Sequence, residues 1–133
     1  MRIATTLLVS VLLLVGAAEA ELKVRGTGTK RVLVKEQFTG ATLARYDLFA
    51  TRCTKCHAMG RIIDALDWGT TPITGVAFDD PAIRTYVVKM MRKTRSGISK
   101  KDAKELVEFL LDARRIANPD GEPPSSPTSQ ESR

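Results

Sequence analysis

The chain has 133 residues, with 21 Lys and Arg against 15 Asp and Glu, so its formal net charge at pH 7 is +6. This length corresponds to one small domain with a thin core. The two cysteines and one histidine exclude a secreted disulfide scaffold, which normally spreads several cysteine pairs along the chain.

The first twenty residues are typical of a secretory signal peptide. Arg2 gives a positive start, residues 7–15 form an apolar run, and an Ala-Glu-Ala site precedes Glu21. The apolar run is short for a membrane span. We therefore expect a signal peptide over 1–20 and export to the periplasm, with a retained N-terminal anchor as the alternative. Export would exclude nucleic acid as a partner.

Basic charge is concentrated in the middle of the chain. Residues 21–117 carry 19 Lys and Arg against 11 Asp and Glu, whereas residues 118–133 have a net charge of −2. The terminal stretch is rich in Pro, Ser and Gly and has too few apolar residues to offset its ordering entropy. We expect a disordered tail over 118–133. The basic body favours acidic partners, and a solvated surface without any partner is the alternative.

Secondary structure begins with an extended N-terminal segment over residues 21–40. Its glycine-broken alternation and β-branched residues predict a short strand at 31–35. Apolar residues at three-to-four spacing then predict a helix from near Thr42 to close to Cys53. Residues 67–81 contain two prolines and two glycines and predict a loop.

Two further helices are expected in the second half of the chain. One runs over residues 82–93 and is capped by Asp79 or Asp80. The other opens at Ser99, where Asp102 three residues later resembles a capping box. Its apolar stripe consists of Ala103, Leu106, Val107, Leu110 and Leu111. The chain is therefore expected to be mostly α-helical.

The most specific signal is the segment Cys53-Thr54-Lys55-Cys56-His57. Two thiols at this spacing can add across the two vinyl groups of a haem and form thioether bonds. The histidine that follows can then bind the iron as its proximal ligand, and His57 is the only histidine in the chain. This pattern predicts one haem c per chain, covalently attached through Cys53 and Cys56.

Other chemistries of the two cysteines are less well supported. A redox Cys-x-x-Cys pair belongs to a βαβ setting, which this chain does not predict. A structural zinc site would need a fourth ligand beyond Cys53, Cys56 and His57, and the chain has no other Cys or His. A plain disulfide beside an incidental histidine is the remaining alternative.

Around this motif the sequence resembles the class I (monohaem) c-type cytochromes of the bacterial periplasmic type. The resemblance covers residues 41–113 and includes Phe49, four places before the first cysteine, and an amphipathic helix that closes the domain. Arg61 and the runs Val87-x-x-Met90 and Ser96-Gly97-Ile98 extend it. It implies a mostly α, class I cytochrome c-like fold around one covalently bound haem, with the domain at 41–117 and its first and last helices packed across each other.

The resemblance also implies the iron ligands. His57 would be the proximal ligand and Met90 the distal one. Met91 is the alternative, since neighbouring helical residues point about 100° apart, and a sixth position that is open or holds water is a third possibility. The Gly-Pro pair usual after the motif is missing, so Pro72 is the nearest candidate for the carbonyl that orients the histidine ring.

A His/Met site is closed and low-spin, and its thioether raises the reduction potential. We therefore expect an electron-transfer protein with no catalytic residues. Its partners would be redox proteins with acidic docking surfaces, with membrane contact only through a partner complex. The alternatives are a haem subunit that stays docked to a membrane respiratory complex, and an open-site haem protein that binds small ligands.

Docking would use basic residues that flank the motif and the two methionines. If the expected fold is correct, they border one face around the haem edge. They are Arg52, Lys55, Lys89, Arg92, Lys93, Arg95, Lys100 and Lys101.

Overall fold

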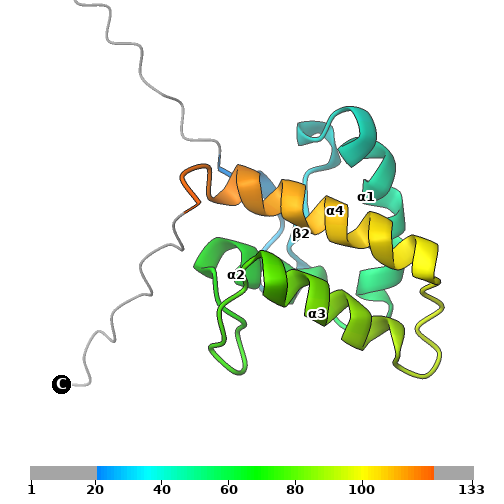
Figure 1. Ribbon diagram of the computed structural model, residues 1–133. Coiled ribbons are helices and arrows are strands. Elements are labelled where there is room, and N and C mark those ends of the chain that lie inside the picture. Colours follow the sequence, from blue (N-terminus) through cyan, green and yellow to red (C-terminus); the bar gives the residue numbers. More distant parts are fainter. Residues whose placement is uncertain (1–20, 122–133) are drawn as a thin grey trace, which may run out of the picture.

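The computed structural model describes residues 21–121, and these are mostly helical (Figure 1). The expected signal peptide and most of the expected tail, residues 122–133, lie outside them. The elements are β1 (Val24–Arg25), β2 (Val32–Leu33), α1 (Gly40–Arg52), α2 (Met59–Trp68), α3 (Asp80–Met91) and α4 (Lys100–Ala117), with 3-10 turns η1 (Gly28–Lys30), η2 (Lys35–Gln37) and η3 (Cys53–Lys55). None of the helices in the described part is long and apolar enough to cross a membrane.

The centre of the core is the crossing of α1 and α4 (Figure 1). Phe49 of α1 stacks on Phe109 of α4 with their ring centroids 4.5 Å apart, and both side chains are fully buried. Phe38, just before α1, meets Phe109 edge-on at 5.1 Å. Such aromatic pairs contribute about 0.5–1.5 kcal/mol beyond their area burial. The apolar stripe expected on the last helix is buried in full, which confirms that prediction.

The ends of α3 and α4 are determined by capping groups. The Ser99 hydroxyl accepts from the Asp102 N–H and the Asp102 carboxylate accepts from the Ser99 N–H, so the expected capping box is confirmed. At α3 the cap is Asp79, whose carboxylate accepts from the Ala82 N–H at 2.9 Å. Asp80 instead binds Arg114 of α4 at 2.9 Å, so this ion pair links α3 to α4.

Helix α2 was not anticipated from the sequence. It begins after Ala58, which supplies no side-chain cap, and it ends at Gly69, whose φ of +64° suits glycine. Its inner face buries Ile63 and Leu66 completely. The helix has only ten residues and lacks an N-cap signal. Its local signals are the apolar residues Met59, Ile63 and Leu66 at helical spacing and the glycine at its end.

The N-terminal segment is an extended hairpin that packs on α1 and α2. Val24 lies opposite Leu33 in the antiparallel pair β1–β2. The expected strand at 31–35 is therefore present, although only two of its residues pair. Leu22, Leu33 and Phe38 bury their side chains in the core and anchor the segment.

Candidate cofactor-binding site

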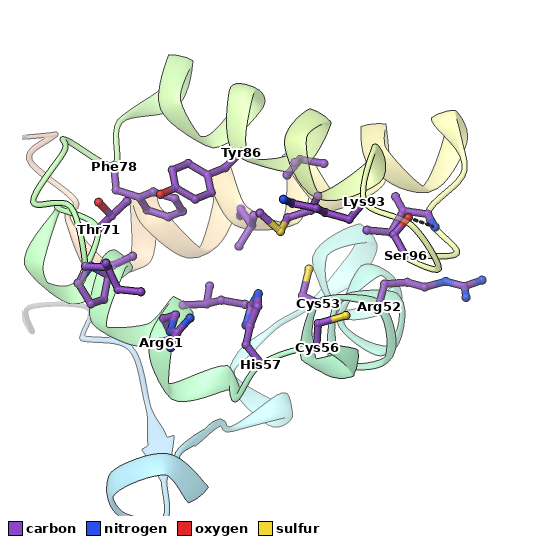
Figure 2. A pocket seen from close by; sticks show the side chains of 18 residues that line it. Arg52, Cys53, Cys56, His57, Arg61, Thr71, Phe78, Tyr86, Lys93 and Ser96 are labelled. Atoms are coloured by element: carbon purple, nitrogen blue, oxygen red, sulfur yellow. Dashed lines mark hydrogen bonds between the residues drawn. The ribbon is translucent and has the colours of Figure 1, made fainter.

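An apolar pocket lies between α3 and the chain that joins α1 to α2 (Figure 2). Its volume is about 220 Å³, below the range of about 300–1,000 Å³ usual for ligand pockets. A large planar cofactor would therefore widen it or leave one edge exposed. The lining residues are Arg52, Cys53, Cys56, His57, Arg61, Ile62, Ala65, Thr71, Pro72, Ile73, Phe78, Tyr86, Val87, Met90, Lys93, Ser96, Ile98 and Leu110.

Both cysteines reach this pocket as free thiols. They lie on and directly after η3, which continues α1, and the Thr54 hydroxyl donates to the Ala50 carbonyl across this junction. Residues three apart in a 3-10 turn share one side, so Cys53 and Cys56 face the pocket together (Figure 2). Cys53 is half-buried and Cys56 is exposed. Burial raises the pKa of the Cys53 thiol to about 12.

His57 follows the cysteines and is half-buried in the pocket wall. Its Nδ1 is buried and has no hydrogen-bond partner. No hydrogen bond joins this ring to the candidate Pro72 carbonyl in the structure, although Pro72, on the α2–α3 loop, lines the same pocket. An unsatisfied buried polar atom costs about 1–3 kcal/mol. The polypeptide thus leaves a ring nitrogen of His57 free, as a metal ligand requires.

The structure separates the two candidate methionines. Met90 lines the pocket, and its helix α3 lies across the pocket from His57 (Figure 2). Met91 instead packs against the hydrophobic core. Cys53, Cys56, His57 and Met90 are therefore brought together, whereas Met91 is directed elsewhere.

Basic residues gather at one edge of the pocket. Lys55 donates from Nζ to the Arg95 carbonyl at 2.8 Å, which connects the motif to the α3–α4 loop. Arg52 and Lys93 line the pocket at the same edge (Figure 2). Arg95 holds a left-handed backbone with φ of +65°. Four of the eight expected docking residues therefore lie close together.

The remaining walls come from residues that sequence reasoning did not select. Phe78 is buried and meets Tyr86 edge-on at 5.8 Å, and Thr71 is buried beside them in the α2–α3 loop. Phe78 and Tyr86 are aromatic residues typical of a core, and the polar Thr71 lies in a loop, so none of the three indicated a site. The available clue was an aromatic residue on either side of the helix start at Asp79, with Phe78 before it and Tyr86 on the helix itself.

The donor set fits a haem of the c type. Two thiols are available for thioether bonds, a histidine nitrogen lacks a competing partner, and a thioether sulfur lies on the opposite wall. Comparison of the chain with protein-family models, curated proteins and solved structures finds no match. The functional argument is therefore carried by the motif and the pocket.

Proposed function

We propose that this chain is an exported, periplasmic electron-transfer protein of the class I cytochrome c type. The observation that carries the proposal is the convergence of Cys53, Cys56, His57 and Met90 on one apolar pocket. A haem c held there would supply one-electron chemistry. The crossing of α1 with α4 supports the proposal, because the resemblance implies packing of the first helix on the last.

Each of the four residues has a defined role in this proposal. The thiols of Cys53 and Cys56 would each hold the haem by adding across one vinyl group, so that a carbon–sulfur bond would form and the thiol hydrogen would move to the neighbouring carbon without any oxidant. His57 would serve as the proximal ligand and Met90 as the distal one. The apolar lining of the pocket would limit the access of water to the iron, which would favour outer-sphere electron transfer over chemistry at the iron.

The first experiment is mass spectrometry of the exported protein. We expect the mass of the chain from Glu21 plus one haem, and pigment that survives acid–acetone extraction. The double variant Cys53→Ala/Cys56→Ala should lose this added mass, whereas Met91→Ala should keep it, since that side chain packs on the core. A protein without pigment, or one that releases it to acid–acetone, would refute the proposal.

The second element of the proposal is the partner. The basic edge formed by Arg52, Lys55, Lys93 and Arg95 would steer redox proteins with acidic docking surfaces toward the exposed side of Cys56. Steering weakens as the Debye length falls from about 10 Å at 0.1 M salt to about 3 Å at 1 M. We expect the second-order rate of electron transfer with an acidic partner to fall markedly with salt.

Charge reversal locates the surface involved. Lys93→Glu changes a residue of the pocket edge, whereas Lys23→Glu makes the same change in net charge on the N-terminal hairpin, which does not line the pocket. We expect Lys93→Glu to flatten the salt dependence and Lys23→Glu to leave it nearly unchanged. Equal effects of the two, or a rate indifferent to salt in the unmodified protein, would contradict docking at this edge.

A further inference from the structure

The N-terminal hairpin, residues 21–37, has no role in the function proposed above. Within the hairpin, the Val34 N–H donates to the Lys23 carbonyl at 2.9 Å. This pairing determines where the peptide groups of the neighbouring hairpin residues point. Hydrogen bonding alternates along an antiparallel pair, so the N–H and C=O of Leu33 point away from β1. They are available to the helices beneath the hairpin.

Leu33 uses both groups to join the two helices that flank the haem-attachment motif. Its N–H donates to Sδ of Met59, at the start of α2, over 3.2 Å. Its carbonyl accepts from the hydroxyl of Tyr46, on α1, at 2.8 Å. Leu33 as a whole residue is 1% exposed. Its bond to Met59 is buried and its bond to Tyr46 is partly buried, so competing water has limited access to both. A single residue thus connects the chain before Cys53 to the chain after His57.

Arg31 makes a second connection to the same turn of α2. Its guanidinium donates to the Gly60 carbonyl at 3.3 Å and forms an ion pair with Asp64. Both charged side chains are about one-quarter exposed, so solvent screens them less than a surface pair. A Cβ on Gly60 would lie 3.1 Å from the Gly28 carbonyl oxygen. A side chain at this position would therefore require the Gly28 carbonyl of the hairpin to shift by a few tenths of an ångström.

These connections reach the first turn of α2, which directly follows the motif that contains His57. Helix α2 starts directly after His57 and Ala58 with no side-chain cap of its own, so its first turn is not held by local sequence. We propose that the N-terminal hairpin is a positioning brace, which uses Leu33 and Arg31 to set the orientation of His57 relative to the two cysteines. The inference rests on the proposed function, because it concerns the geometry of the iron ligand.

Two conservative variants remove one side of the brace each. Met59→Leu keeps the side-chain volume and leaves the Leu33 N–H without an acceptor, and Tyr46→Phe leaves the Leu33 carbonyl without its donor. Each is measured in the haem-loaded protein. We expect both to shift the reduction potential and to weaken the far-red methionine-to-ferric-iron band at temperatures where the protein is fully folded.

Arg31→Lys is a milder variant should the first two fold poorly, because it keeps a charge near Asp64 but loses the planar fork that also reaches Gly60. Lys23→Arg is the matched control. Like Arg31→Lys it exchanges one basic side chain for another on the same hairpin, but at an exposed position. We expect Arg31→Lys to shift the potential and Lys23→Arg to leave it unchanged.

The outcomes separate the two proposals. A haem-bearing protein whose variants lose thermal stability but keep potential and band would overturn the brace alone, since the hairpin would then only stabilise the fold. A control that shifts the potential as much as Met59→Leu would also overturn it. An unmodified protein without covalent haem would overturn the proposed function, and the brace with it.

Discussion

Replacing the two neighbouring methionines one at a time should produce two different defects. Met90 lines the pocket and Met91 packs on the core, although the two are adjacent on α3. We expect Met90→Ala to abolish the far-red methionine-to-ferric-iron band and to lower the reduction potential, because a thioether ligand raises it. Met91→Ala should leave the spectrum intact and lower the stability of the fold.

The size of the Met91 effect follows from its burial. Truncating a fully buried methionine to alanine costs about 2–5 kcal/mol, and Met91 is only half-buried. We therefore expect a loss of about 1–2 kcal/mol in the free energy of unfolding. For a domain of this size, each kcal/mol lowers Tm by about 4–8 °C, so the change is readily measured by thermal or urea unfolding of the haem-loaded protein.

Val88→Ala is the control for this comparison. Val88 lies on the same helix but is 36% exposed and does not line the pocket. Its truncation should change stability by less than about 0.5 kcal/mol, as surface substitutions usually do, and should leave the spectrum alone. If Met91→Ala removes the band while Met90→Ala keeps it, the facing of α3 is wrong by one residue. If neither variant changes the spectrum, methionine is not a ligand.

Three further predictions concern the scaffold. Ser99→Ala removes the capping box of α4 and should cost about 1 kcal/mol in urea unfolding; an unchanged midpoint would contradict a role for the cap. Arg95 has a left-handed backbone with φ of +65°, which is strained for arginine and tolerated by asparagine. Arg95→Asn should therefore stabilise the fold by about 0.5 kcal/mol in the same assay. A loss of stability would mean that the contacts of the arginine side chain outweigh the backbone strain. The hydrogen bond from Arg45 lowers the pKa of Glu105 from its ordinary value of 4.5. The stability that ionised Glu105 contributes is therefore present above a pH of about 4.5 and is lost as the pH falls through the lowered pKa. Glu105→Gln should therefore flatten the decline of Tm in acid, and a decline as steep as in the unmodified protein would count against this pair.

Features that depend on neighbours a few residues apart can be predicted from the amino-acid sequence. The Cys-x-x-Cys-His motif can be recognised because Cys53, Cys56 and His57 lie within five consecutive residues. The last helix can be predicted because Ser99 and Asp102 form a local capping box and its apolar residues recur at helical spacing. Such signals need no knowledge of what the element packs against.

Features that depend on partners distant in the sequence follow from how the helices and the hairpin pack together. Asp79 rather than Asp80 caps α3 because Asp80 binds Arg114 from another helix. Met90 rather than Met91 faces the pocket because the packing of α3 on α4 sets the rotation of the helix. Helix α2, which lacks a cap, is held by packing and by contacts with Leu33, far away in sequence. An apolar stripe predicts the general facing of a helix, but packing between distant segments decides which of two neighbouring apolar residues lines the pocket.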